Sequence, residues 1–218
     1  MKRSLLIEMP LPIEWDKTEF NANKSFKSRL KYAIDRAKKA GTGSSRIAVV
    51  IEFEGRKTIL KFVKNKKGFA QNKAEADFLD DYYMEGLEIA IPLIDYDMQN
   101  DPPVWIHTEF AEKASERELC NIMKCDSLDD LVRMANYVGN VGPRTNRLDP
   151  GLSVGQLSED DAETRREYIE KIAELAGSYD IEVDDFKTKA NWGIFDGRAV
   201  VIDVGLSKDV WQTHYVRR

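Results

Sequence analysis

The chain has 218 residues, 42% of them hydrophobic, which is enough apolar material for one large domain or two small lobes. Its formal net charge of −5 argues against nucleic acid as an obligatory partner. Cys120 and Cys125 have no Cys or His companions nearby to complete a structural zinc site, and two thiols suit a reducing compartment, so we expect a cytoplasmic protein.

The N-terminal segment has a basic start, but Glu8 interrupts its apolar run. It therefore predicts a short strand rather than a signal peptide or a membrane span. We expect residues 16–20 to be a linker. Residues 25–40 carry apolar side chains at helical spacing behind Ser25, a plausible N-cap, and predict a helix of about four turns.

Two glycines follow this helix, and the sequence leaves two interpretations of them open. Gly41 ends the helix as a C-cap with Gly43 as a loop residue, or Gly41, Gly43 and Ser44 form a glycine loop that cradles phosphate groups. Apolar runs at residues 47–53 and 57–63 then predict two strands joined by a tight turn.

Lys61 lies inside the second of these strands, between apolar neighbours. Burying an ammonium group without a partner is costly, so the chain must supply a carboxylate. Glu75 is the natural candidate, because it stands in a segment, residues 71–79, whose apolar side chains have helical spacing and could face the sheet. We therefore predict an ion pair between Lys61 and Glu75.

The rest of the chain predicts two further strands and then mainly helices. Pro102 and Pro103 favour an extended chain ahead of the second strand. Glycines and prolines predict a long loop after the second of the helices. The expected elements are strands within residues 89–94 and 104–107, helices at 115–123, 127–136 and 159–176, and the loop at 139–155.

Near the C-terminus Asn191 precedes a hairpin turn and an apolar strand, which leads to Asp203 and Gly205. Taken alone, this pattern fits turn chemistry with a carboxylate at a strand end. It also fits a metal site, because an Asn and an Asp on neighbouring segments can both offer oxygen to magnesium.

Taken in order, the glycine loop, the strand lysine, the helix glutamate, the asparagine and the Asp-x-Gly segment resemble the protein-kinase-like superfamily. Residues 60–62, 66–72 and 191–193 also resemble small kinase-like proteins of tailed bacteriophages. The resemblance implies that ATP and magnesium bind. The implied ligands are Gly41, Gly43, Ser44, Lys61 and Glu75 for the nucleotide, and Asn191 and Asp203 for the metal.

The resemblance also implies an α+β, two-lobed kinase-like fold. Residues 1–110 would form an N-terminal lobe with an antiparallel sheet and helices, and residues 111–218 a reduced helical C-terminal lobe. Residues 109–111 would be the hinge that holds the adenine. Only residues 206–218 follow the Asp-x-Gly segment, so we expect this second lobe to lack a full platform for a peptide substrate.

One departure from the family concerns catalysis. Kinases of the superfamily place an aspartate base five residues before the metal-binding asparagine, and here that position is Phe186, which cannot accept a proton. Asp184 and Asp185 stand immediately before it. A longer loop could present either carboxylate as the base, or the pair caps a turn.

Three functions follow from these observations. The first is a pseudokinase that binds ATP and magnesium, transfers phosphate poorly and acts through a protein partner. The second is an active small phosphotransferase with Asp184 or Asp185 as its base. The third is a structural, virion-associated protein that uses the scaffold only for packing.

Overall fold

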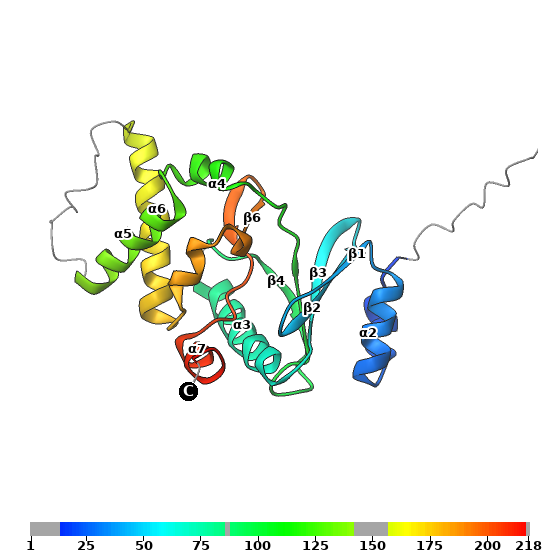
Figure 1. The fold of residues 1–218 in the computed structure, drawn as a ribbon. Helices are drawn as coiled ribbons and strands as arrows, with labels where there is room; N and C mark the ends of the chain where they lie inside the picture. The colour runs from blue at the N-terminus through cyan, green and yellow to red at the C-terminus, as the bar shows by residue number, and fades with distance from the viewer. Residues whose placement is uncertain (1–13, 86–87, 142–156, 217–218) are drawn as a thin grey trace, which may run out of the picture.

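The computed structural model describes residues 14–85, 88–141 and 157–216. A five-stranded antiparallel sheet lies beside a group of helices, so the α+β class predicted from the sequence is confirmed (Figure 1). The strand predicted near Glu8 lies outside the described residues. None of the helices within the described residues is long and apolar enough to cross a bilayer.

The sheet has the strand order β1-β2-β3-β5-β4, and β6 and β7 form a separate hairpin. Two short 3-10 helices, η2 and η3, precede that hairpin. The elements are α1 (Lys17–Ala22), α2 (Phe26–Asp35), β1 (Lys39–Thr42), β2 (Arg46–Phe53), β3 (Arg56–Val63), α3 (Lys66–Glu85), β4 (Leu93–Tyr96), β5 (Trp105–Glu109), α4 (Glu116–Met123), α5 (Leu128–Val141), α6 (Glu159–Ser178), η2 (Val183–Lys187), η3 (Lys189–Asn191), β6 (Trp192–Phe195), β7 (Arg198–Val201) and α7 (Lys208–His214).

Both hairpins turn through two residues with positive φ. Glu54 and Gly55 have φ of 52° and 75°, and Asp196 and Gly197 have φ of 50° and 74°. Such type I′ turns match the right-handed twist of paired strands, and a glycine at the second position adopts this backbone without strain. The turns therefore fix the register of β2 against β3 and of β6 against β7.

Three predictions in the first quarter of the chain were wrong or incomplete. Residues 16–20 are not a linker, because Asp16 caps α1 by accepting a hydrogen bond from the Glu19 amide at 2.7 Å. Ser25 does cap α2 as predicted, but the helix ends at Asp35 instead of residue 40. The next residues form β1, in which Gly41 pairs with Ala48, so Gly41 is no C-cap.

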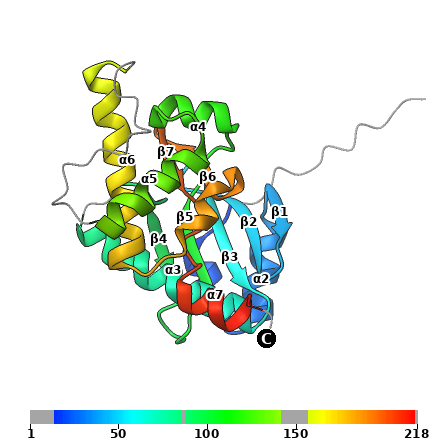
Figure 2. The ribbon, with the colours of Figure 1, turned by 60° about the vertical axis from the view of Figure 1, so that its left-hand side comes forward.

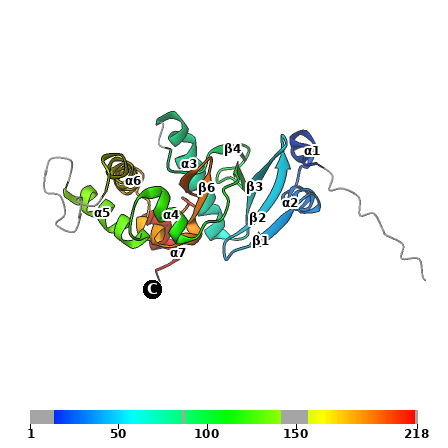
Figure 3. The same cartoon turned by 90° about the horizontal axis from the view of Figure 1, so that it is seen from above.

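The sheet is covered on both faces (Figure 3). Alternate residues of β2, β3 and β5 point to opposite faces, as strand geometry requires. Helices α1 and α2 cover the outer face with an aromatic core, and α3 packs on the inner face. The outer core comprises Trp15, Phe20, Tyr32, Ala33, Val49, Ile51, Leu60, Phe62 and Trp105.

A second core joins α3, α4, α5 and α6 to the β6–β7 hairpin, which lies between the sheet and helices α5 and α6 in Figure 1. Phe186 and Trp192 are buried in it, and the Trp192 indole donates a hydrogen bond to the Phe186 carbonyl at 2.8 Å. Helix α5 reaches Val141, so the predicted loop begins later than residue 139; residues 142–156 lie outside the described part.

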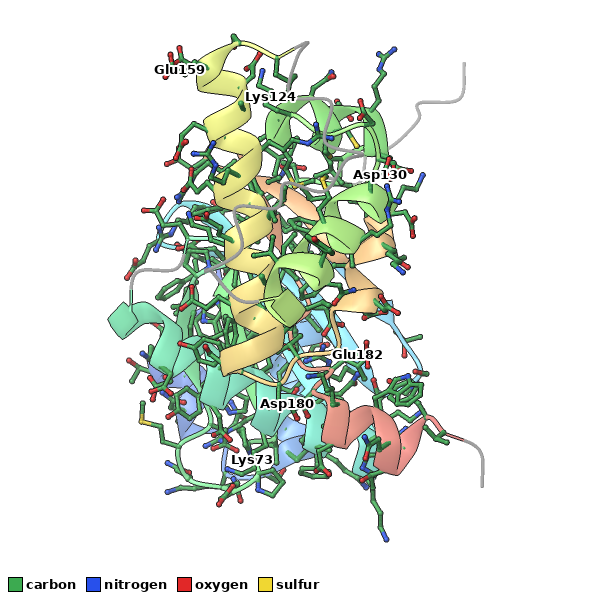
Figure 4. All side chains as sticks on the ribbon, turned by 90° about the vertical axis from the view of Figure 1, so that its left-hand side faces the viewer. Lys73, Lys124, Asp130, Glu159, Asp180 and Glu182 are labelled. Atoms are coloured by element: carbon green, nitrogen blue, oxygen red, sulfur yellow. The ribbon has the colours of Figure 1, made fainter. Side chains whose placement is uncertain are left out.

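The outer side of α6 is polar and solvated. Figure 4 shows Glu159 at its first turn, with Lys124 beside it, Asp130 on α5, and Asp180 and Glu182 beyond its other end. Lys124 and Asp161 form an exposed ion pair at 3.0 Å. Helix α6 is therefore amphipathic: one stripe of its side chains is buried, and the charged face is solvated.

The burial of His107 beside the outer core makes the stability of the fold depend on pH. Its side chain is buried, its Nε2 lies 2.8 Å from the Thr58 hydroxyl, and burial lowers its pKa from 6.5 to about 4. Between these pH values the unfolded chain binds a proton that the folded chain does not. Acidification from pH 6.5 to 4 should therefore cost up to about 3 kcal/mol of stability at this residue.

The prediction is checked by denaturant unfolding of the wild type and His107→Gln across this pH range. Carboxylates titrate in both proteins, so their contribution cancels in the difference. We expect a smaller loss of stability on acidification in the variant, and equal losses would contradict the buried neutral imidazole.

Candidate functional site

Two basic side chains project from the inner face of the sheet. Arg46 begins β2, and Lys61 lies opposite Ala48 in the register of β2 with β3. Because residues two apart on a strand share a face, Arg46, Ala48 and Lys61 all point toward α3. Both cationic side chains are buried, with 8% of each residue accessible.

Glu75 of α3 lies between these two cations and is fully buried. Its Oε1 accepts a hydrogen bond from Lys61 Nζ, and its Oε2 accepts one from Arg46 Nη1. The ion pair predicted between Lys61 and Glu75 is therefore present. Asn72, one turn before Glu75 on α3, is also buried, and its Oδ1 lies 3.4 Å from Arg46 Nη1.

The same two cations reach across to the segment that follows β7. Lys61 Nζ donates to the Ile202 carbonyl at 2.7 Å, and Arg46 Nη2 donates to Asp203 Oδ1 at 2.6 Å. The resulting network has two positive and two negative side chains, supplied by β2, β3, α3 and the segment after β7. We call Arg46, Lys61, Glu75 and Asp203 the charge network.

Asp203 is the most accessible member of the charge network, with 38% of its side chain exposed. Burial opposes its ionisation, but the positive charges of Arg46 and Lys61 outweigh that effect and lower the pKa of Asp203 below its usual value. The carboxylate is therefore ionised at neutral pH.

Gly205 allows this segment to pass directly against α3. A Cβ atom at this position would lie 2.7 Å from the Gln71 carbonyl oxygen, closer than packed atoms tolerate. The glycine of the Asp-x-Gly segment thus has a steric role, because it lets Asp203 approach the N-terminal half of the chain.

Asn191 and Asp185 approach Asp203 from the other side. The β6–β7 pairing continues by one residue, so the Ile202 amide donates to the Asn191 carbonyl at 2.9 Å. The Asn191 side-chain amide donates to the Asp185 carbonyl, also at 2.9 Å. Burial and the negative charge of Asp203 raise the pKa of Asp185.

These residues surround a cavity of about 400 Å³ between the inner face of the sheet and the hairpin, which we call the central cavity. Its volume is in the range of small-molecule sites. Apolar, charged and amide side chains contribute to its walls. The lining residues are Gly43, Ser44, Ser45, Arg46, Ala48, Ile59, Lys61, Gln71, Ile91, Thr108, Glu109, Ala111, Asp185, Ala190, Asn191, Ile202, Asp203, Leu206 and Tyr215.

The central cavity contains most, but not all, of the site residues predicted from the sequence. Gly43 and Ser44 line it, as do Asn191 and Asp203, whereas Gly41 lies further back in β1. Of residues 109–111, predicted as the hinge, Glu109 and Ala111 contribute to the wall.

The structure separates the two candidate bases. Asp185 lines the central cavity. Asp184 is exposed, pairs with Lys187 at 3.0 Å and lines a different hollow of about 270 Å³ between α5 and α6. Phe186 points into the helical core. Asp184 is therefore poorly placed for any chemistry in the central cavity, and only Asp185 of the pair remains a candidate there.

The glycine loop is held by α3 and by the residues before it. Lys64 Nζ donates to the Gly43 carbonyl at 2.7 Å, and Asn65 Nδ2 donates to the Ser44 carbonyl at 3.0 Å. A Cβ atom on Gly68 would lie 2.2 Å from the Ser45 carbonyl oxygen, so only glycine permits this approach of α3 to the loop.

Arg46, Gln71 and Tyr215 are among the wall residues that were not predicted from the sequence. Arg46 stands between Ser45 and the apolar run of β2, so the argument from apolar neighbours on both sides that was used for Lys61 does not apply to it. Gln71 and Tyr215 have no local signal. They meet because α7 packs beside α3 (Figure 2), where Gln71 Nε2 donates to the Tyr215 hydroxyl at 3.1 Å.

Comparison with known proteins adds no assignment. No family model matches the chain, and no curated protein matches it at a significant level. Within the described ranges, no group of three or more His, Cys, Asp or Glu side chains is arranged to hold a metal ion.

The charge network can be tested through Glu75→Gln. The substitution keeps the shape of the side chain but removes the charge shared by two buried cations, so it should lower the free energy of unfolding by about 3–5 kcal/mol. Glu52→Gln on β2 is the matched control. Glu52 pairs with Lys38 at the surface, and its loss should cost less than about 1 kcal/mol.

Urea denaturation of the two variants measures this difference. Equal, small effects would show that Glu75 does not hold the network together.

Proposed function

We propose that the protein binds ATP in the central cavity and that its two halves correspond to the lobes of a kinase-like fold. The observation that carries the proposal is the Lys61–Glu75 ion pair, which borders a cavity lined on its far side by Asn191 and Asp203. The order of these residues along the chain and their convergence in space both support it.

The walls of the central cavity suit the parts of a nucleotide. Ala48, Ile59 and Ile91 offer apolar surface to a base, next to the backbone of residues 109–111. Lys61 brings an ammonium group to the inner end, where it would contact phosphate oxygens. Glu75 keeps that ammonium in place.

The side chains around Asp203 offer the type of ligand atom that magnesium prefers. Asp185, Asn191 and Asp203 carry oxygen atoms, which hard cations prefer, and they line one cavity. When bound, magnesium would neutralise phosphate charge. Asn191 and Asp203 would hold it, and Asp203 would have to exchange its bond to Arg46 for the metal.

Phosphate transfer itself should be weak. The position that carries the base in kinases holds Phe186, whose ring is buried in the helical core. A protein that binds nucleotide without efficient transfer acts through its conformation, so we propose a protein partner as the recipient of that signal.

Lys61→Met tests nucleotide binding. Because Glu75 keeps its bond to Arg46, the variant should fold, but a charged contact to phosphate worth about 1.5–3 kcal/mol is lost. The affinity for a non-hydrolysable ATP analogue with magnesium should fall at least about tenfold by calorimetry.

Lys57→Met is the matched control. Lys57 lies on the same strand but is exposed, with its ammonium 3.2 Å from Glu112. Its substitution should leave the affinity unchanged. An analogue that binds neither wild type nor control would overturn the proposal.

One observation favours the second function, an active phosphotransferase. Asp185 lies in the central cavity, and its raised pKa makes it a stronger base than an ordinary carboxylate. In this case Asp185 would take the proton from the attacking hydroxyl while Lys61 orients the phosphates. The chain would then use a base one residue further from Asn191 than kinases do.

Asp185→Asn and Asp184→Asn form a matched pair for this function. Whatever autophosphorylation or ATP hydrolysis the wild type shows should fall by about 10²–10⁴-fold in Asp185→Asn, because proton removal is lost. It should stay the same in Asp184→Asn. Equal rates in all three proteins would exclude Asp185 as a base, and ATP binding without any turnover would leave only the pseudokinase.

A further inference from the structure

The kinase-like resemblance assigns roles to Lys61, Glu75 and Asp203, but it assigns none to Arg46. Glu75 already has one buried cation in Lys61, yet a second cation is directed to it. The guanidinium spans two carboxylates: its Nη1 faces Glu75 and its Nη2 faces Asp203 at 2.6 Å. Arginine holds the two carboxylates with separate nitrogen atoms in one rigid plane, whereas lysine would have to share a single ammonium between them.

Asp203 depends on this contact. Among the described residues, Arg46 is the cation that forms an ion pair with Asp203. Asp203 Oδ1 also accepts a long hydrogen bond, 3.4 Å, from the Gly205 amide. Oδ1 of Asp203, which lines the central cavity, is therefore bonded to a guanidinium.

We propose that Arg46 is a built-in counter-ion of Asp203 and that it competes with a divalent cation for that carboxylate. The inference rests on the proposed function, in which Asp203 is a metal ligand. Magnesium binds oxygen at about 2.0–2.1 Å and requires a near-octahedral shell, so it can use Oδ1 only by displacing Nη2. It must also overcome repulsion from the guanidinium at short range.

An order of binding follows from this competition. Without nucleotide, Arg46 keeps the charge network neutral and the metal binds only weakly. A phosphate chain entering the central cavity offers Arg46 another anionic partner, which releases Asp203. Metal binding then depends on the nucleotide, while nucleotide phosphate still finds two cations, Arg46 and Lys61, at the site.

The test uses Mn²⁺ alone, with no nucleotide, and counts free Mn²⁺ by electron paramagnetic resonance. We expect wild type to bind Mn²⁺ weakly and Arg46→Gln to bind it at least about tenfold more tightly, which is a gain of about 1.4 kcal/mol. The gain should disappear in Arg46→Gln/Asp203→Asn. Arg166→Gln, which removes an exposed arginine of α6, should behave as wild type.

Circular dichroism and thermal unfolding show whether each variant is folded. Arg46→Gln leaves Glu75 paired with Lys61 and should fold. Arg46→Lys is the second variant, because an ammonium lacks the planar two-nitrogen fork of the guanidinium and should hold the two carboxylates less firmly. Its Mn²⁺ affinity should lie between those of wild type and Arg46→Gln. A folded Arg46→Gln with wild-type affinity would overturn the proposal, as would a gain that persists in the double variant. If Arg46→Gln does not fold, wild-type affinity in Arg46→Lys would overturn it.

The outcome is separable from that of the proposed function. The Mn²⁺ titration contains no nucleotide, so competition at Asp203 can be observed even if ATP does not bind. Conversely, ATP binding that depends on Lys61, together with unchanged Mn²⁺ affinity in Arg46→Gln, would leave the proposed function standing and remove Arg46 from it.

Discussion

The rest of the site depends on the pairing of the buried Glu75 carboxylate with Arg46 and Lys61. This carboxylate is fully inaccessible to water and holds one cation from β2 and one from β3. An unpaired charge in that place would be very costly, so β2, β3 and α3 must assemble together for the buried charges of Arg46, Lys61 and Glu75 to be tolerated. The central cavity is the space left beside this arrangement.

Part of this arrangement could be derived from the sequence because it follows from local rules. The hairpin turns need residues that tolerate positive φ, and both carry a glycine at the second turn position. A lysine between apolar strand residues demands a carboxylate, and a helix with a suitable Glu follows. These rules predicted β2, β3, α3 and the Lys61–Glu75 contact.

Other features depend on contacts between distant residues, and the sequence does not contain them locally. The segment at Gly41 joins the sheet because its backbone pairs with β2, although its neighbours have helical spacing. The choice between Asp184 and Asp185 depends on a 3-10 helix, in which successive side chains point about 120° apart. The burial of Arg46 is likewise not indicated locally, because it follows Ser45 and stands before the apolar run.

The bonds of Arg46 and Lys61 to residues 202–203 have a mechanical consequence. These two contacts link the sheet to the loop after the β6–β7 hairpin, and both lie at the wall of the central cavity. If the two halves of the molecule move apart, both contacts should break together, because β2 and β3 are hydrogen-bonded to each other and move as one unit. The residence time of any molecule held between the halves is thereby coupled to the lifetime of two polar contacts, and a change at either one would alter how fast the cavity exchanges its contents.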